Sequence, residues 1–305
     1  MSKFRPMLAA SFDNPQEYES ELVFLQYPLL CSPKIDGIRF MKSPQGPAMS
    51  RTWTPLPNRR LQTFMTSDPM FDHVDGEVIV GDDPTKPGIF NETQSAIMTR
   101  DDDRPFSLWI FDYWSDPNRM FANRTAHAKD VVDEIRRKGS LNVNYVEHQV
   151  AENVEDVIRL EQEALEAGFE GLMLRRPDAP YKFGRSTLKQ QGLIKVKRFA
   201  DAEAEIIGFE ALERNTNEQT RNAFGLAKRS SHKAGKVADN LLGRLLVRAE
   251  PWGEFAIGSG FDVDTRTEIW NRQDHYLGKT VTFKFQAHGT QDKPRMPIFK
   301  GFREE

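Results

Sequence analysis

The chain has 305 residues, a formal net charge of −3 and 38% hydrophobic residues, which is the composition of an ordinary globular protein with room for two domains. Its single cysteine, Cys31, excludes a disulfide framework and any multi-cysteine zinc module, so we expect a reducing, cytoplasmic setting. The opening residues do not resemble a signal peptide, and no apolar run approaches the roughly 20 residues that a membrane helix needs. We therefore expect no association with a membrane.

The first distinctive stretch is residues 31–40, which place a lysine, a carboxylate, a glycine and an arginine within six positions. Pro33 favours extended backbone at the residue before it, so Lys34 is not expected inside a helix. Asp36 and the glycine after it are typical of a turn, and the alternation of Ile38 to Phe40 is typical of a strand. We predict a hairpin turn at the rim of a sheet, where Lys34 can meet a ligand. An ordinary hairpin with a solvated lysine is an equal alternative on these residues alone.

Helical and strand patterns alternate along the chain that follows. Asn58 is predicted to cap a helix, and residues 101–103 are predicted to form a solvated loop instead of an acidic metal cluster. Further helices are expected at residues 123–138, stopped by Gly139, and from Asn153 to near Gly168. Strands are expected after a turn at Asp75 and Gly76, and at residues 108–114, 169–176 and 193–197.

The second half of the chain has a different pattern. After Phe199 several short strands are separated by Gly, Asn and Ser turns, so we place a domain boundary near residue 200. Residues 221–237 carry no acidic side chain and five basic ones, which are Arg221, Lys228, Arg229, Lys233 and Lys236. We predict an ordered hairpin that lies along a nucleic-acid backbone, with a merely solvated basic face as the alternative.

A reactive Lys34 needs particular neighbours. A free lysine has a pKa near ~10.4, so its nucleophilic neutral form is scarce at neutral pH. Lys195 and Lys197 share one face of their strand, and such cations favour a neutral amine and can hold a phosphate. Carboxylates at Glu77 and Glu170 suit a ribose hydroxyl or a hydrated Mg²⁺. The side chains suited to the phosphates and the base of a nucleotide are Arg39, Arg51, Arg185 and Phe111.

Together these motifs resemble the covalent nucleotidyltransferase superfamily, and within it the minimal two-domain ATP-dependent DNA ligases. The resemblance runs from about Pro6 to Arg303. Six ordered motifs and a terminal motif carry it, at residues 34–39, 50–51, 75–77, 111–113, 170–175, 193–197 and 295–299.

The resemblance implies an ATP-dependent DNA ligase (EC 6.5.1.1) of replication, repair and recombination. Lys34 would take AMP from ATP, pass it to the 5′-phosphate of a nick, and the 3′-hydroxyl would then displace it. The implied catalytic residues are Lys34, Asp36, Lys195 and Lys197. Those implied for the nucleotide are Arg39, Glu77, Phe111 and Arg295, with Glu170 for Mg²⁺ or Mn²⁺. Those implied for DNA are Arg51, Arg185, Lys228, Arg229, Lys233 and Lys236.

The resemblance also implies the fold and the partners. We expect an α+β nucleotidyltransferase domain at residues 1–199, with ATP-grasp-like antiparallel sheets and helices. An all-β OB-fold domain is expected at residues 200–305, with a DNA-binding latch at about 209–240. The expected partner is nicked duplex DNA, which two domains would encircle unaided, and the expected state is a monomer. A viral member would act in the host cytoplasm, or in the nucleus of a eukaryotic host.

Four alternatives stand beside this interpretation. An mRNA capping guanylyltransferase shares the lysine and the OB domain but uses GTP, whereas an RNA ligase usually lacks this OB arrangement. A non-catalytic OB-type DNA-binding protein would account for the basic segment but leave the ordered motifs idle. A Walker-type ATPase has little support, because Gln273 stands where the phosphate loop needs a glycine.

Overall fold

The computed structural model describes residues 4–12, 18–221, 227–230, 232, 235–286 and 292–303. The chain divides into two compact units, Met1–Lys197 and Arg198–Glu305, where the sequence placed a boundary near residue 200. Within the described residues, no helix is long and apolar enough to cross a membrane.

The N-terminal unit contains two five-stranded sheets. The first has the strand order β1-β10-β9-β2-β8, with bounds Ala10–Ser11, Ile194–Val196, Leu172–Arg175, Leu29–Pro33 and Gln149–Ala151. The second has the order β4-β3-β5-β6-β7, with bounds Ala48–Ser50, Ile38–Lys42, Val74–Val80, Phe106–Tyr113 and Val143–Tyr145. β1 joins β10 in parallel and β7 joins β6 in parallel, and the other pairs are antiparallel.

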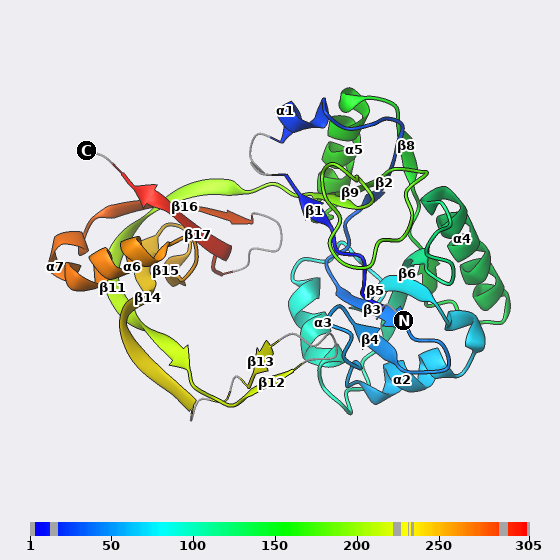
Figure 1. The fold of residues 1–305 in the computed structure, drawn as a ribbon, viewed down its shortest axis with the longest axis horizontal. Coiled ribbons are helices and arrows are strands. Elements are labelled where there is room, and N and C mark those ends of the chain that lie inside the picture. Colours follow the sequence, from blue (N-terminus) through cyan, green and yellow to red (C-terminus); the bar gives the residue numbers. More distant parts are fainter. Residues whose placement is uncertain are drawn as a thin grey trace. The chain divides into compact units, whose positions relative to one another are not determined.

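Helices cover each sheet (Figure 1). Together with the sheets they enclose two apolar cores. On the first sheet lie α1 (Glu19–Leu22) and α5 (Val154–Glu166), and the apolar side chains of α5 pack on β2 and β9. On the second lie α2 (Arg59–Thr66), the short 3₁₀ turn Pro69–Phe71 and α4 (Phe121–Arg137), with α3 (Ile89–Ile97) beside β5 and β3. Because each sheet buries one face under its helices, the polar side chains of the other face are available for a site.

Several local predictions are confirmed. Asn58 caps α2 by accepting a 2.9 Å hydrogen bond from the backbone N–H of Leu61, and Asn153 caps α5 through Asp156. Gly139 follows the end of α4 with φ of 100°, a left-handed conformation that suits glycine. Residues 101–103 form a loop. In each case the residues that cause the cap, the helix end or the loop lie within a few positions of it in the sequence.

Two strand predictions are wrong. Residues 34–37 do not close a hairpin, because β2 pairs with β8 and β9 while β3 pairs with β4 and β5 in the other sheet. Asp75 and Gly76 are not a turn either, since both lie inside β5. The register of β5 between β3 and β6 supplies backbone partners that outweigh the turn preference of an Asp-Gly pair.

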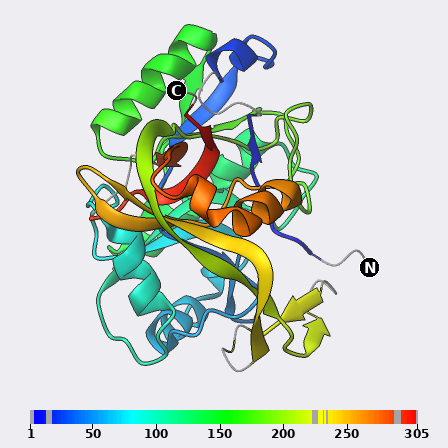
Figure 2. The ribbon, with the colours of Figure 1, turned by 90° about the vertical axis from the view of Figure 1, so that its left-hand side faces the viewer.

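The C-terminal unit is a five-stranded antiparallel sheet with the order β15-β14-β11-β16-β17. The bounds are Gly253–Ile257, Lys236–Ala249, Ala200–Asn215, Thr280–Gln286 and Arg295–Phe302, and the helices are α6 (Val263–Asn271) and α7 (Gln273–Tyr276). Several short strands were expected, but β11 and β14 are long and run beside each other (Figure 2). Beyond their far ends, β12 (Gln219–Arg221) and β13 (Ala227–Arg229) form a short antiparallel ribbon.

Candidate active site

Lys34 lies on the connection between the two sheets of the N-terminal unit, directly after β2. Its backbone N–H donates to the carbonyl of Gly171 at 2.8 Å, and its carbonyl accepts from the N–H of Glu170 at 3.2 Å. These bonds join the Lys34 segment to the residues that precede β9. The site therefore lies where the chain crosses from one sheet to the other, and not at the tip of a hairpin.

Two glycines allow this close approach. A Cβ on Gly37 would lie 2.5 Å from the carbonyl oxygen of Val78, and a Cβ on Gly171 would lie 2.2 Å from that of Val196. Gly171 also has φ of 147°, a conformation that other residues rarely adopt. The glycines that follow Asp36 and Glu170 in sequence are thus needed for backbone contact with β5 and β10.

Glu170 holds two lysines at once. One carboxylate oxygen forms an ion pair with the Lys34 ammonium, and the other accepts from Lys197 Nζ at 3.0 Å. Although burial favours the protonated acid, the two ammonium groups lower the pKa of Glu170 to about 2. The Glu170 side chain is 3% exposed while that of Lys34 is 23% exposed. The lysine can therefore be reached by a ligand while its carboxylate partner is buried.

The pKa values of Glu77 and Lys195 are shifted toward the uncharged form of each side chain. Burial raises the pKa of Glu77 to about 7, against the opposing influence of the Lys34 and Arg39 cations. Burial and the ammonium groups of Lys197 and Lys34 lower the pKa of Lys195. Near Lys34 the structure thus places a carboxyl group with a raised pKa, Glu77, and a lysine with a lowered pKa, Lys195. Such shifted pKa values are typical of functional sites.

Arg39 is fixed by contacts within the protein. Its Nε and Nη2 donate to the two carboxylate oxygens of Asp75 at 2.9 and 2.6 Å, and its Nη1 donates to the carbonyl of Met7 at 2.7 Å. The guanidinium carbon lies 5.5 Å from the centre of the Phe111 ring. Its two remaining N–H donors have directions set by the forked pair with Asp75.

Phe111 occupies a β-bulge in β6. Gly76 pairs with Ile110 and Asp75 pairs with Asp112, so Phe111 is the extra residue of this strand. Bulges of this kind re-aim side chains beside active sites. Here the ring packs near Ile35 and Ile79, in the small apolar cluster beside the Lys34 segment.

Buried charges lie under this ring. Asp112 accepts from Arg124 Nε at 2.8 Å and also pairs with Arg175, and each of the three side chains is at most 5% exposed. Burial favours the neutral acid, but the two guanidinium groups hold the pKa of Asp112 below its usual range. The guanidinium carbon of Arg175 lies 5.4 Å from the Phe111 ring centre.

The structure brings most of the predicted nucleotide site together, and two more predicted residues, Arg185 and Asp36, lie near it. Arg185 donates to the carbonyl of Ala9 at 2.7 Å and acts electrostatically on Lys195, and Asp36 is buried and acts on Glu77. Arg51 is exposed in the turn after β4.

The remaining predicted residues belong to the C-terminal unit. Arg295 begins β17 and pairs with Gln286. Arg229 in β13 donates to Gln219 at 3.2 Å, and Lys236 pairs with Glu213 at 3.1 Å. Lys233 lies outside the described residues, as does the side chain of Lys228, although the backbone of Lys228 belongs to β13.

Sequence reasoning did not predict the buried contacts that support the site, above all those of Asp75 and Tyr181. The Tyr181 hydroxyl donates to Asp75 at 2.8 Å. Period-two alternation could have found Asp75, because it shares a face of β5 with Glu77. Residues 181–187 also resemble the family in sequence, but no pattern gives Tyr181 a role, because it meets Asp75 only through the tertiary fold.

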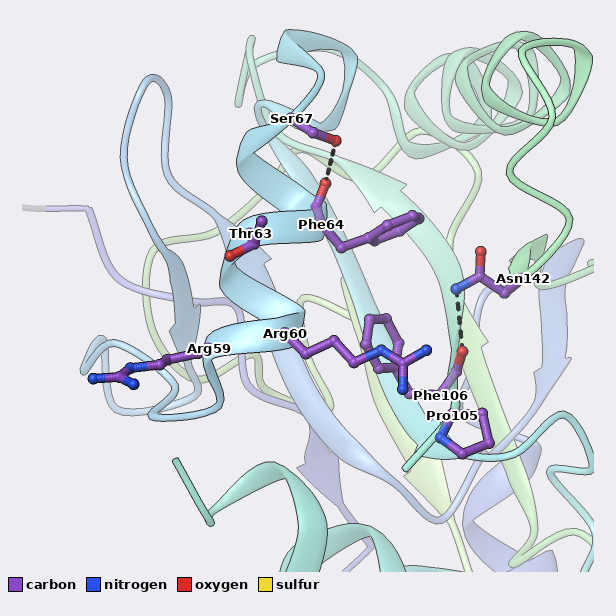
Figure 3. A pocket seen from close by; sticks show the side chains of 8 residues that line it. All are labelled: Arg59, Arg60, Thr63, Phe64, Ser67, Pro105, Phe106 and Asn142. Atoms are coloured by element: carbon purple, nitrogen blue, oxygen red, sulfur yellow. Dashed lines mark hydrogen bonds between the residues drawn. The ribbon is translucent and has the colours of Figure 1, made fainter. Parts of the chain in front are cut away.

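A hollow elsewhere on the N-terminal unit contains none of the predicted site residues. Figure 3 shows it between α2 and the start of β6, where Phe64 and Phe106 form its apolar wall and Arg60 lies above Phe106. The Lys34 site depends instead on charged groups at the sheet junction.

Comparisons with known proteins agree with this class of site. Residues 6–197 match the family described as ATP dependent DNA ligase domain, and residues 234–303 match a DNA ligase OB-like domain. The crystal structure of Chlorella virus DNA ligase-adenylate is 33% identical, covers 98% of this chain and 99% of its own, and superposes with a TM-score of 0.54. This confirms the resemblance to ATP-dependent DNA ligases that the motifs indicated.

Other relatives are more distant. A structure of a Lig E DNA ligase is 23% identical, covers 98% of this chain and 99% of its own, and has a TM-score of 0.68, which supports the fold. The DNA ligase of Natronomonas pharaonis is 25% identical over 76% of this chain and 42% of its own length. The African swine fever virus DNA ligase is 26% identical over 35% of this chain. The chain thus spans 26% and 42% of the curated relatives it matches.

The fold and the site define a covalent nucleotidyltransferase domain followed by an OB-fold domain. The chain belongs to the family of ATP-dependent DNA ligases.

Proposed function

We propose that the chain seals nicks between a 5′-phosphate and a 3′-hydroxyl in duplex DNA, with Lys34 as the residue that carries AMP. The observation that supports this most strongly is the position of Lys34. It is a reachable amine at the junction of two sheets, beside a buried carboxylate that also holds Lys197.

In the first step, the neutral amine of Lys34 attacks the α-phosphorus of ATP. A nitrogen–phosphorus bond forms, the bond from the α-phosphorus to the bridging oxygen breaks, and pyrophosphate leaves with its electron pair. The amine loses a proton to form lysyl-AMP. Lys195 and Lys197 would neutralise charge on the phosphates, and such fixed charge is the main contribution an enzyme makes to this chemistry. Arg295 of the C-terminal unit is assigned to the pyrophosphate side of ATP.

The nucleotide is held by groups around Phe111. The bulged ring stacks on adenine, while Glu77 and the two remaining donors of Arg39 bind the ribose hydroxyls. The raised pKa of Glu77, at about 7, lets its carboxyl group donate as well as accept a hydrogen bond near neutral pH.

A divalent cation fits this donor set only together with its nucleotide. Among the described residues there is no group of three or more His, Cys, Asp or Glu side chains that could hold a metal. Mg²⁺ commonly uses one or two carboxylates, several waters and substrate phosphates. Glu170, whose pKa is lowered by the two ammonium groups, would hold Mg²⁺ or Mn²⁺, and the cation would supply charge neutralisation at the phosphates.

In the two later steps AMP passes to the DNA and then leaves it. An oxygen of the 5′-phosphate attacks the lysyl-AMP phosphorus, the nitrogen–phosphorus bond breaks, and Lys34 is restored. The 3′-hydroxyl then attacks the 5′-phosphate and loses its proton, and AMP leaves as the new phosphodiester forms. Asp36 is assigned to this sealing step, and Arg51 and Arg185 to the phosphates of the nick.

The ribbon of the C-terminal unit is assigned as a latch on duplex DNA. It comprises β12, β13 and the adjoining ends of β11 and β14, within residues 209–240. Asn217 orders its base by donating to the carbonyls of Ser230 and His232 at 3.0 and 2.9 Å. Its basic residues Lys228, Arg229, Lys233 and Lys236 would contact the DNA backbone of a protein acting as a monomer.

A nick-sealing assay tests this function. The protein is incubated with Mg²⁺, a nicked duplex with a labelled 5′-phosphate, and either ATP or GTP. We expect sealing with ATP and none with GTP, and a Lys34→Ala variant should not seal. A parallel reaction uses radiolabelled ATP or GTP with Mg²⁺ and measures the label that stays on the protein. Labelling of the protein by GTP would favour a capping guanylyltransferase, and DNA binding without any nucleotide transfer would favour a non-catalytic OB protein.

A further inference from the structure

Four groups form a closed ring of hydrogen bonds behind the nucleotide site. The backbone N–H of Met7 donates to the Tyr181 hydroxyl at 3.2 Å, and that hydroxyl donates to Asp75 at 2.8 Å. Asp75 accepts the forked pair from Arg39, and Arg39 donates back to the carbonyl of Met7 at 2.7 Å. The backbone N–H and the carbonyl of Met7 thus both belong to the ring that holds Arg39.

The ring is buried and well matched chemically. Met7 and Asp75 are 0% exposed and Tyr181 is 3% exposed. Burial, followed by the nearby Asp75 carboxylate, raises the pKa of the Tyr181 phenol well above its usual value, so the phenol donates and the carboxylate accepts. A buried network in which each group has its partner is rigid, and it becomes costly when a single partner is removed.

The same N-terminal segment reaches two more of the predicted cations. The carbonyl of Ala9 accepts from Arg185 at 2.7 Å, and Ser11 of β1 pairs with Lys195 of β10. Residues 7–11 therefore contact three basic residues that come from three distant parts of the chain. This segment therefore fixes the three basic residues relative to one another.

We propose that Tyr181 and the backbone of Met7 are positioning groups for nucleotide binding, which act by fixing the two remaining donors of Arg39. The inference rests on the proposed function, because Arg39 serves there as a ribose ligand. Tyr181 itself acts through Asp75 and Arg39. Its effect should therefore appear in the affinity for ATP and should vanish when the arginine side chain is absent.

The test measures self-adenylation in a single turnover, for the half-saturating ATP concentration and the maximal rate. Tyr181→Phe keeps the ring and removes the hydroxyl, so we expect the half-saturating concentration to rise about fivefold, as the loss of one positioning hydrogen bond allows. The maximal rate should change by less than about twofold. In an Arg39→Ala background the same substitution should have no further effect, because coupled sites are not additive.

The matched control is Tyr276→Phe, which removes a 2.7 Å phenol bond to the carboxylate of Glu268 in the other unit. It should leave the half-saturating ATP concentration unchanged. If Arg39→Ala is too slow to label, equilibrium ATP binding to Lys34→Ala proteins carrying the same substitutions gives the same cycle.

Two results would overturn the inference. Either Tyr181→Phe leaves ATP affinity unchanged, or its effect is the same with and without Arg39, which indicates a purely structural role. A wild-type protein that takes no label from ATP contradicts the proposed function instead, so the two failures are distinguishable.

Discussion

Glu77 lies on β5 beside the Lys34 and Arg39 cations, yet burial raises its pKa from 4.5 to about 7. The folded protein therefore binds this proton more tightly than the unfolded chain. Such a group contributes stability that is fully present below the unfolded pKa and is lost as the pH rises through the folded pKa. Between pH 4.5 and about 7 the charged carboxylate should progressively destabilise the fold.

We expect this pH dependence to disappear in Glu77→Gln, which mimics the protonated acid. Compared with this variant, the wild type should become less stable as the pH rises from about 5 to about 8. Urea unfolding of both proteins across this range measures the difference. A difference in the free energy of unfolding that is constant with pH would contradict the raised pKa.

Gly171 shows how an element depends on one residue. A Cβ there meets the carbonyl oxygen of Val196 at 2.2 Å, whereas a Cβ on Gly139, which also has positive φ, meets nothing within 4 Å. Gly139→Ala should therefore cost only the backbone strain, about 1 kcal/mol of unfolding free energy. Gly171→Ala should cost about 2–4 kcal/mol, because strain and overpacking add.

The two glycine variants should also differ in activity. Separation of β9 from β10 moves Glu170 away from Lys197, so Gly171→Ala should lose most of its ATP labelling while Gly139→Ala keeps it. Thermal unfolding and labelling of both proteins provide the check. Equal effects of the two substitutions would show that the contact with Val196 is unimportant.

The buried pairs under Phe111 support β6 and α4 as a unit. Asp112→Asn leaves Arg124 and Arg175 buried without their counter-charge, and breaking a buried ion pair costs about 3–5 kcal/mol. The control is Asp178→Asn, which removes the partner of Arg176 from a pair whose carboxylate is 53% exposed. Such a surface pair contributes about 0–1 kcal/mol. A small effect at Asp112, measured by urea unfolding, would refute the assigned role of the network.

At the scale of the whole molecule, DNA binding and nucleotide transfer should be separable. Replacing Lys228, Arg229, Lys233 and Lys236 by alanine should weaken binding of a nicked duplex by at least about tenfold and make it less dependent on salt. ATP labelling should be unaffected. The matched control replaces four exposed cations of α4, α5 and their flanks, which are Lys129, Arg137, Lys138 and Arg159. Equal loss of binding and labelling would contradict the latch.

Local signals in the sequence were sufficient for the elements whose causes are local. The cap at Asn58 and the stop at Gly139 depend on neighbouring residues, and both are confirmed. The apparent hairpin at Lys34 failed because the partners of β2 are β8 and β9, more than a hundred residues away in the chain. Pairings over such separations are not encoded in any short pattern.

The residues of the site likewise fall into those that the sequence predicts and those that it does not. Lys34, Glu77 and Glu170 were predicted because family motifs mark them, and the fold brings them together. The ring behind Arg39 was missed because its bond from Met7 to Tyr181 spans 174 positions. The lengths of β11 and β14 also escaped prediction, since their bulged register depends on the partner strand. The sequence therefore does not predict the contacts that hold each site residue in place, because these contacts join residues that are far apart in the chain.

Peptide mapping shows directly whether Lys34 is the residue that carries AMP. The protein is incubated with ATP and Mg²⁺, digested, and the AMP-bearing peptide is located by mass spectrometry before and after addition of nicked duplex. We expect AMP on Lys34 alone, its loss when the nick is added, and no adduct in Lys34→Ala. AMP on another lysine, or an adduct that persists in Lys34→Ala, would contradict the account.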